Sequence, residues 1–432
     1  MTTKITRINQ ISKERPKEVF TSIYHLINKE LLKESFEELD GSKAVGIDKI
    51  TKDEYRHNLD NNLDNLVKRL KNKGYRPSPA RRVNIPKANG KLRGLAISNF
   101  EDKIVQMAIK KLLEAIYEPK FTNNMFGFRP NRGCHNALGY LGKCIEHNKV
   151  DYILDADIKG YFDNISHNKL MKCLEIHIKD KNLLRLIKRF LKAGIMENGT
   201  YIKGQLGTPQ GSILSPVLAN IYMYYALILW FEKIKKISKG YVEIINYADD
   251  MIVCFQHGNE AKKIYELMKT RLKQVGLEFA EDKTRLIEFG RFAYERRKKR
   301  GLGKPETFDF LGFTHYCSKS KNGKYRVKRK TSKKKFKQKL QEFKIWIKNN
   351  RNRKLKELIS TIKKKLIGHY NYYGINDNYK CLNRFLHQIK RLLFKWLNRR
   401  SQRRSYNWER FNQITHMINL PKPTIKVNIY DI

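Results

Sequence analysis

The sequence is poor in cysteine and shows no sign of export or membrane insertion. Its six cysteines are scattered and form no CxxC pair, which argues against a zinc module and favours a reducing, cytoplasmic setting. The start of the chain is polar, so no secretory signal is expected. We find no uninterrupted apolar stretch of about 18 residues, and the sequence therefore predicts no membrane partner.

Acids are also scarce. The chain of 432 residues carries 42 Asp and Glu against 90 Lys and Arg, a formal net charge of +48. Self-repulsion on that scale is unfavourable unless a polyanion offsets it, so nucleic acid is the expected partner and its binding should depend strongly on salt. An anionic membrane surface is the weaker alternative. Hydrophobic residues make up 41% of the chain, enough for two or three globular domains.

One pair of the scarce acids is informative. The tetrapeptide Tyr247-Ala248-Asp249-Asp250 lies between two apolar runs, 242–245 and 251–255, whose β-branched content predicts a hairpin with the acids at its turn. Adjacent carboxylates flanked by buried strands repel each other, and a divalent cation would relieve that cost. An isolated Asp-Asp pair is more often a solvated turn, but the flanking strands argue against that interpretation here.

A third carboxylate is expected from a neighbouring strand, because phosphoryl transfer by two Mg²⁺ ions needs several hard oxygen ligands. Residues 151–158 resemble a strand with Asp157 near its end. Asp155 and Asp163 compete with Asp157 on spacing alone. Since Asp155 and Asp157 point to the same face of a strand, periodicity cannot separate them.

The remaining elements predict a mixed chain with a basic helical end. In chain order we expect helices over 1–70, a basic β-hairpin over 79–93 that turns at Asn89-Gly90, helices over 104–117, 168–193, about 216–232 and 260–274, and a strand over 308–313. The basic loop 291–300 is expected to be a solvated excursion whose charges can still touch phosphate. After about residue 320 the composition becomes strongly basic, and three helices are expected.

Several motifs follow one another in a specific order. They are Tyr75-Arg76-Pro77, Ile85-Pro86-Lys87 with Arg93-Gly94-Leu95, the run 127–132, the run 157–163, the Pro-Gln-Gly block 207–216, the Tyr-Ala-Asp-Asp box, Glu281-Asp282-Lys283-Thr284, and 310–313. In this set the chain, from about residue 35 to its end, resembles the reverse transcriptases (maturases) encoded by bacterial group II introns. Ser212 stands where many relatives carry a second Gly. The basic tail resembles the thumb, or maturase X, domain of that family.

The resemblance implies an α+β fold shaped as a right-hand polymerase. It places an N-terminal helical extension and the start of the fingers in 1–70, fingers and an antiparallel-sheet palm in 71–320, and an all-α thumb (maturase X) domain in 321–432. The chain resembles the form of the family that lacks a C-terminal endonuclease, because its tail has no Cys pairs. Such a mobile element would prime from an existing 3′ end or a host nick.

The resemblance also implies an activity and partners. An RNA-directed DNA polymerase would extend a DNA primer or target DNA with dNTPs on an RNA template, using two Mg²⁺ ions, in a ribonucleoprotein with its group II intron RNA, whose splicing it aids. Two alternatives stay open: the same polymerase recruited to host defence or repair, and an RNA-binding maturase that only aids splicing. A structural RNA-coating protein would explain the charge but not the acids. The sequence does not fix the oligomeric state.

By the same resemblance, Asp157, Asp249 and Asp250 form the metal-binding catalytic triad, and the backbone carbonyl of Ile158 is a further metal ligand. The residues implied to hold the nucleotide are Lys87, Arg93, Phe162 and Gln210. Phe162 matches an aromatic gate that would reject a ribose 2′-hydroxyl by a steric clash.

The remaining site residues are implied less directly. Lys283 is a candidate general acid for the pyrophosphate leaving group. The primer grip would be Phe310, Leu311, Gly312 and Phe313, and the template or RNA contacts would be Arg81, Arg82 and Arg129. Four simpler interpretations stay open: a structural ion pair for Arg129, a turn residue for Gln210, a core aromatic for Phe162 and a surface lysine for Lys283.

Overall fold

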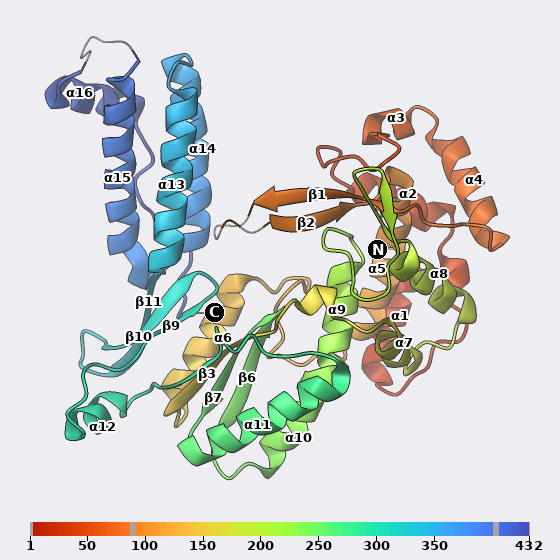
Figure 1. The fold of residues 1–432 in the computed structure, drawn as a ribbon, viewed down its shortest axis with the longest axis horizontal. Helices are drawn as coiled ribbons and strands as arrows, with labels where there is room; N and C mark the ends of the chain where they lie inside the picture. The colour runs from red at the N-terminus through yellow and green to blue at the C-terminus, as the bar shows by residue number, and fades with distance from the viewer. Residues whose placement is uncertain (1–2, 87–89, 91, 401–405, 432) are drawn as a thin grey trace.

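A computed structural model describes residues 3–86, 90, 92–400 and 406–431, with the backbone alone over 414–417. A central antiparallel sheet forms the base of the molecule, a β-hairpin with its helices stands on one side, and a bundle of long helices stands on the other (Figure 1). We refer to these parts as palm, fingers and thumb. The mixture of helices with largely antiparallel sheets, in which β1 and β4 form the one parallel pair of named strands among the described residues, confirms the predicted α+β class.

Amphipathic helices pack the N-terminal region against one buried helix, α5 (Phe100–Tyr117), whose Ile104, Ala108 and Leu112 are fully buried. The helices that precede it are α1 (Thr3–Glu14), α2 (Lys29–Glu38), α3 (Lys52–Arg56) and α4 (Leu59–Lys71). The side chain of Thr51 starts α3 in a capping box with Glu54. The predicted helices over 1–70 and 104–117 are confirmed.

The fingers contain a four-stranded sheet of order β2-β1-β4-β5. Its strands are β1 (Ala80–Pro86), β2 (Leu92–Ile97), β4 (Ile195–Glu197) and β5 (Thr200–Ile202). β1 and β2 form the predicted antiparallel hairpin, although Asn89 of its turn lies outside the described residues. The β4–β5 hairpin was not predicted, because strands of three residues are too short to show a period.

The palm sheet has the order β6-β7-β3-β8, and all its pairings are antiparallel. Its strands are β3 (Tyr152–Asp157), β6 (Val242–Tyr247), β7 (Asp250–Phe255) and β8 (Arg285–Glu288). Alternate residues of β7 enter two different core clusters, Val253 on one face and Ile252 on the other. Helix α6 (Cys134–His147) packs on one face and α11 (Gly258–Val275) on the other. Because both faces are covered, the strand is apolar throughout instead of alternating.

One palm helix is unusually apolar. It runs continuously as α9 (Ser215–Met223), a π-helical segment (Tyr224–Ile228) and α10 (Leu229–Ile237). The sequence analysis did not expect an apolar stretch of spanning length, yet Ser215–Ile237 is long and apolar enough to cross a membrane by length and composition. In this protein 67% of its most apolar window is buried inside the fold, as expected for a core helix.

Three sequence-based elements differ from the structure. The helix predicted over 168–193 is two helices, α7 (His167–Glu175) and α8 (Lys181–Lys192), because the Asp180 carboxylate between them caps α8 at 2.9 Å from the Asn182 N–H. The loop 291–300 contains a short helix, α12 (Ala293–Lys299). The strand over 308–313 turns sharply at Leu311 and Gly312, with φ of +48° and +79°.

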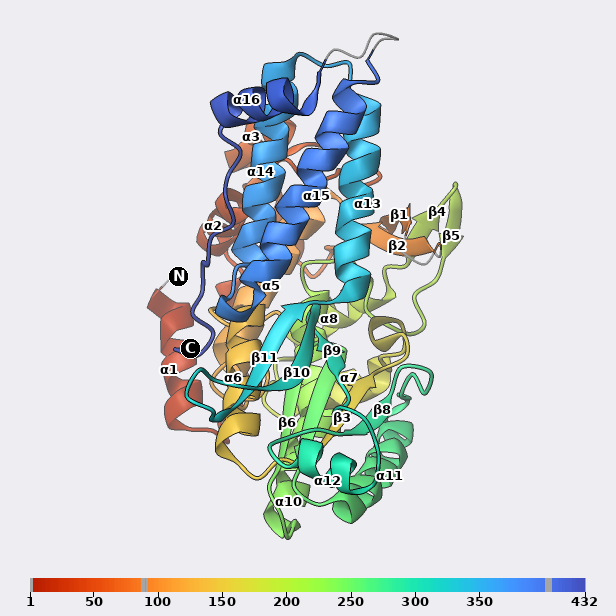
Figure 2. The same ribbon diagram turned by 90° about the vertical axis from the view of Figure 1, so that its left-hand side faces the viewer.

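That turn separates β9 (Phe308–Phe310) from β10 (Phe313–Lys319), which pairs with β11 (Tyr325–Thr331). The predicted division of the chain near residue 320 falls inside the β10–β11 hairpin. The thumb helices then follow and lie side by side in both views (Figures 1 and 2): α13 (Lys333–Asn350), α14 (Leu355–Tyr373) and α15 (Tyr379–Leu397), with α16 (Trp408–Ile418) at their far end.

Candidate active site

The palm sheet brings the three predicted aspartates to one edge. β6 and β7 are joined by a turn of two residues, Ala248 and Asp249, after which Asp250 begins β7. On the other side of β7, Asp157 lies directly opposite Asp250 in the β3–β7 pairing. The backbone N–H of Ile158 donates to the Asp249 carbonyl at 3.4 Å, which ties the end of β3 to the turn.

The loop that contains Gly127 supports the turn from behind. A side chain at Gly127 would place its Cβ only 2.5 Å from the Ala248 nitrogen, so the close approach requires glycine. Two buried amides hold the contact: Asn246 Nδ2 donates to the Ala248 carbonyl, and Asn220 Nδ2 donates to the Gly127 carbonyl, both at 2.8 Å. Ala248 itself has a φ of +59°. The position of the acids is therefore fixed by packed neighbours.

The acids repel one another at the edge of the sheet, where Asp249 is half-buried and Asp250 faces the cavity. Burial, followed by the negative charges of Asp249, Asp157 and Asp155, raises the pKa of Asp250 to about 7. Burial and the nearby Asp157 also raise the pKa of Asp249, while Arg93 and Lys283 act in the opposite direction. The cluster thus needs positive charge to be fully ionised near neutral pH.

Two cations already contact neighbouring acids. The Lys283 ammonium forms an ion pair with the Asp157 carboxylate, and this hydrogen bond raises the pKa of Lys283. Arg285 pairs with Asp155 at 3.2 Å, yet burial still raises the pKa of Asp155 to about 6. Lys283 is therefore part of the site and is not an isolated surface lysine.

The donor set suits a hard divalent cation such as Mg²⁺, which prefers carboxylate oxygen and takes its other ligands from water and substrate phosphate. As the side chains stand, no three Asp, Glu, His or Cys side chains of the described residues converge on a common metal position. The Lys283 ammonium occupies the Asp157 carboxylate in this arrangement. A metal ion would replace one cation with another at that carboxylate.

On the fingers side, the Pro-Gln-Gly loop connects the palm to β2. The Gln210 carbonyl accepts a hydrogen bond from the Ala96 N–H at 2.7 Å, and the Thr208 N–H donates to the Phe162 carbonyl at 2.7 Å. Gln210 and Phe162 therefore lie on one connected backbone beside the strand that carries Arg93. The Gln210 backbone serves the turn, and its half-buried side chain makes no protein hydrogen bond among the described residues. Lys87 lies outside the described residues.

Phe128 is a site residue that the sequence analysis did not identify. Its ring is 49% exposed and lies 6.0 Å from the ring of Phe162 in an edge-to-face arrangement. Its φ of +58° is rare for a bulky residue and turns the ring toward the acids. The motif 127–132 contained Phe128, but no sequence signal distinguishes a left-handed phenylalanine from a core one.

A cavity of about 650 Å³ lies between the acids and the thumb. The palm contributes Asp249 and Asp250, and α13 and α14 contribute the cations Lys335, Lys339 and Lys365. Of the predicted primer grip, the turn residues Leu311 and Gly312 line this cavity, whereas Phe310 and Phe313 are buried. The rings of Phe310 and Phe313 pack in the core and the turn between them faces the cavity, and contact of this segment with a primer stays a prediction.

The three predicted template arginines differ in exposure. Arg129 is buried, and its guanidinium donates to the Glu118 carboxylate at 2.7 Å and to the Met125 carbonyl at 2.9 Å. This is the structural ion pair that the sequence left open, and a template contact of Arg129 stays a prediction. Arg81 is half-buried and donates to the Val45 carbonyl at 2.8 Å. Arg82 lies 3.6 Å from Glu197 on the sheet surface.

Comparisons with known proteins agree with this arrangement. Residues 85–315 match the family described as "Reverse transcriptase (RNA-dependent DNA polymerase)", and residues 333–413 match "Group II intron, maturase-specific domain". The group II intron-encoded protein LtrA of Lactococcus lactis is 40% identical over 222 residues, which are 51% of this chain and 37% of LtrA. Protein YkfC of Escherichia coli K12 is 36% identical over 42% of this chain and 49% of YkfC.

This chain therefore spans less than two thirds of the length of these relatives. An uncharacterized 91 kDa protein in the cob intron of Schizosaccharomyces pombe is 41% identical over 38% of this chain and 20% of that protein. Among solved structures, telomerase from Candida albicans in complex with a telomeric RNA fragment aligns with 80% of this chain and 61% of that chain, at a TM-score of 0.45 and 13% identity. The first family match covers more than half of the chain, so the chain belongs to the reverse transcriptase family and carries a group II intron maturase-specific domain after the matching residues.

Proposed function

We propose that the chain is an RNA-directed DNA polymerase that adds dNTPs to a primer 3′-hydroxyl on an RNA template. The observation that carries the proposal is the meeting of Asp157 with Asp249 and Asp250 at one edge of the palm sheet. The cavity beside them has cationic side chains on its thumb wall, as a nucleic-acid strand requires. Family membership agrees with this activity.

Each side chain then has a role that fits its place. Asp157, Asp249 and Asp250, with the Ile158 carbonyl, would hold two Mg²⁺ ions, which when bound would activate the primer hydroxyl and stabilise the leaving pyrophosphate. Arg93 on β2 would hold the triphosphate and Gln210 the base pair. By the family resemblance Lys87, which lies outside the described residues, would also hold the triphosphate. Phe162 and Phe128, with their rings in edge-to-face contact, would exclude a 2′-hydroxyl. Lys283 would leave Asp157 and donate a proton to pyrophosphate.

The biological setting we propose is a ribonucleoprotein with a group II intron RNA, in the cytoplasm, where the protein aids splicing and then copies the RNA. The maturase-specific match over 333–413 supports this setting over recruitment to defence or repair. The retained acid cluster argues against a maturase that only aids splicing, because three carboxylates that repel each other are unfavourable without a catalytic use.

Incorporation of dTTP on poly(rA)/oligo(dT) tests the proposal. We expect incorporation that requires the primer, the RNA template and Mg²⁺, and that stops when EDTA removes the metal. Poly(rA) without oligo(dT) is the matched control, since it is the same polyanion but offers no base-paired primer 3′-hydroxyl. Incorporation that persists without primer or in EDTA would contradict the proposed reaction.

The raised pKa of Asp250 predicts how Mg²⁺ binding depends on pH. Because its folded-state pKa of about 7 exceeds the ordinary value of 3.8, the folded protein binds more protons between these values, and its stability without metal should fall as pH rises through that range. Mg²⁺ binds the ionised carboxylate, so its addition should raise the melting temperature more at about pH 8 than near pH 6. Thermal unfolding with Mg²⁺ or EDTA measures this, and Asp250→Asn should remove the difference. Equal shifts at the two pH values would disprove it.

A further inference from the structure

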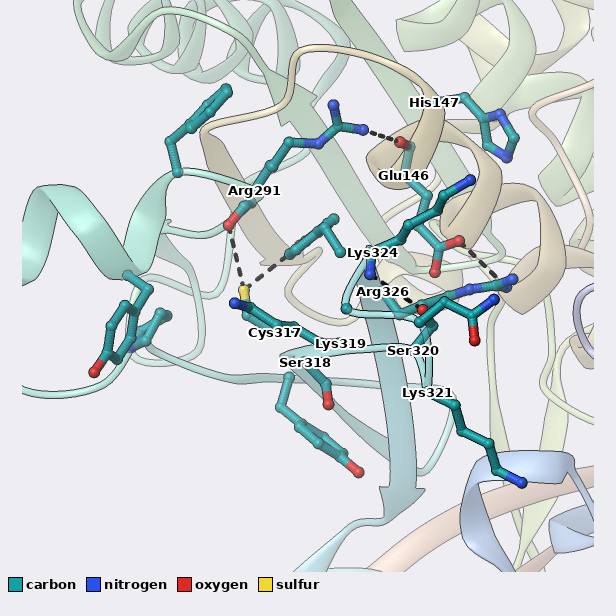
Figure 3. Close-up of a pocket in the computed structure, with 18 of the residues that line it drawn as sticks. Glu146, His147, Arg291, Cys317, Ser318, Lys319, Ser320, Lys321, Lys324 and Arg326 are labelled. Carbon is teal, nitrogen blue, oxygen red and sulfur yellow. Dashed lines mark hydrogen bonds and ion pairs between the residues drawn. The ribbon is translucent and has the colours of Figure 1, made fainter.

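A second and larger pocket lies beside the β10–β11 hairpin, and it shares no lining residue with the cavity at the acids. Its volume is about 1870 Å³, above the roughly 300–1,000 Å³ of pockets for drug-sized ligands. Glu146 and His147, at the end of α6, line one side of it (Figure 3). Residues at the start of α12 and Tyr430 line it as well. α12 lies at the foot of the molecule, far from the β1–β2 hairpin (Figure 1). The volume suits part of a polymer.

The floor and the rim of this pocket differ in charge. On the floor, the Glu146 carboxylate lies 3.6 Å from the Arg326 guanidinium and neutralises its charge. The backbone carbonyl of Glu146 accepts a hydrogen bond from Arg291 at 3.0 Å, and both interactions are drawn in Figure 3. The rim lysines Lys319, Lys321 and Lys324 are exposed, and their ammonium groups make no ion pair or hydrogen bond among the described residues. Glu295 and Asp431 also line the pocket, but its seven lysines and arginines outnumber its three acids, so the lining carries net positive charge, which favours an anionic ligand.

The rim lysines stand on a well-formed turn. The Ser320 N–H donates to the Lys324 carbonyl at 2.8 Å, the Gly323 N–H donates to the Ser320 carbonyl at 3.2 Å, and Gly323 has a φ of +75°. These bonds involve backbone groups and no lysine side chain. The lysines are thus held near one another, and they can be replaced without disturbing the turn.

Exposed aromatic rings flank the same pocket. Phe292 is 48% exposed and Tyr294 is 56% exposed, and neither ring stacks on another ring of the described chain. A duplex would present its phosphates to the lysines but would leave these rings without a partner. Unpaired bases offer faces that stack on aromatic side chains while the backbone follows the cations.

We propose that this pocket binds an unpaired segment of RNA, with the rim lysines on its phosphates and the α12 aromatics on its bases. It would be a second nucleic-acid site, separate from the cavity at the acids. The choice of RNA over DNA rests on the proposed function, in which RNA is the bound partner. Hydroxyl side chains at Ser318 and Ser320 line the pocket and can bond the 2′-hydroxyl that distinguishes RNA.

The test measures the binding of a short fluorescent oligo(rC) to the full chain after a short, fully paired oligo(rA)/oligo(dT) duplex, which offers no unpaired RNA, has filled the catalytic cavity. Replacing Lys319, Lys321 and Lys324 by Gln should reduce the slope of log affinity against log salt by about 2, since each phosphate contact on a single strand contributes about 0.7. Tyr294→Ala should weaken binding about fivefold or more. The matched control replaces three exposed lysines of α11, Lys262, Lys263 and Lys273, by Gln and should change neither quantity.

Extension of poly(rA)/oligo(dT) is measured on the same variants and should be unchanged, so failure of this second site is distinguishable from failure of the polymerase proposal. Equal loss in the α11 control would show that only net charge matters and would overturn the site. So would unchanged binding in the rim or Tyr294 variants. Tighter binding of oligo(dC), of duplex RNA or of phosphatidylserine vesicles at the pocket would overturn the assignment to unpaired RNA.

Discussion

Asp157→Asn should lower dTTP incorporation by about a thousandfold or more, while Asp155→Asn, two residues away on the same strand, should lower it by less than about tenfold. Asp157 lies opposite Asp250 at the sheet edge, whereas Asp155 lies opposite Ile252, about 6.6 Å further along the strand. The Asp155 carboxylate is also occupied by Arg285. Only Asp157 can therefore share a metal ion with the hairpin acids.

The loss should be catalytic and should not come from unfolding. Removing one of several mutually repelling carboxylates lowers their repulsion, and the ion pair with the exposed Lys283 that is lost with it contributes little, so Asp157→Asn should melt close to or above the temperature of the unmodified protein. Asp249→Ala should lose activity to the same degree as Asp157→Asn. Primer extension and thermal unfolding, measured on the same three variants, distinguish a catalytic loss from a loss of folding. An inactive Asp155→Asn, or an active Asp157→Asn that is folded, would place the metal elsewhere.

The comparison of Asp155 with Asp157 shows where sequence reasoning ends. The hairpin acids were predictable because two β-branched runs surround them, a pattern local in sequence. Alternation put Asp155 and Asp157 on one face and could not choose between them. The choice depends on the register of β3 against β7, a pairing between segments almost a hundred residues apart. The resemblance to the family, and not the spacing, selected Asp157.

Backbone conformation and burial account for the other differences. Residues 308–313 look like one strand because all six suit a strand or its edge, and the left-handed Leu311 that breaks it has no sequence signature. Arg129 stands in a motif beside exposed Phe128, yet its guanidinium turns inward to Glu118. Two neighbouring residues of one loop thus differ in burial, one exposed and one buried, and this difference depends on tertiary packing that the sequence does not show.

Arg329→Met should destabilise the folded protein by about 3–5 kcal/mol, the cost of leaving a buried charge without its partner. Arg329 on β11 is fully buried, and it lies 3.6 Å from the carboxylate of Asp377, which is itself nearly inaccessible. Its guanidinium also donates to the Leu138 carbonyl of α6 at 3.2 Å. The C-terminal segment also contacts this buried ion pair, because the Tyr430 hydroxyl donates to the Asp377 carboxylate at 2.9 Å. One side chain thus links the palm, the hairpin and the turn between α14 and α15.

Two further variants separate the charge from the packing. Lys328→Met changes the neighbouring residue, which makes no ion pair among the described residues, and should alter the free energy of unfolding by less than about 0.5 kcal/mol. Adding Asp377→Asn to Arg329→Met should recover about half of the lost stability, because the remaining carboxylate charge is removed while its hydrogen bond from Tyr430 can persist. Urea unfolding of the three variants measures both effects. If the double variant is no more stable than Arg329→Met, the loss comes from the volume and hydrogen bonds of the guanidinium, and the thumb is held by packing at this junction more than by charge.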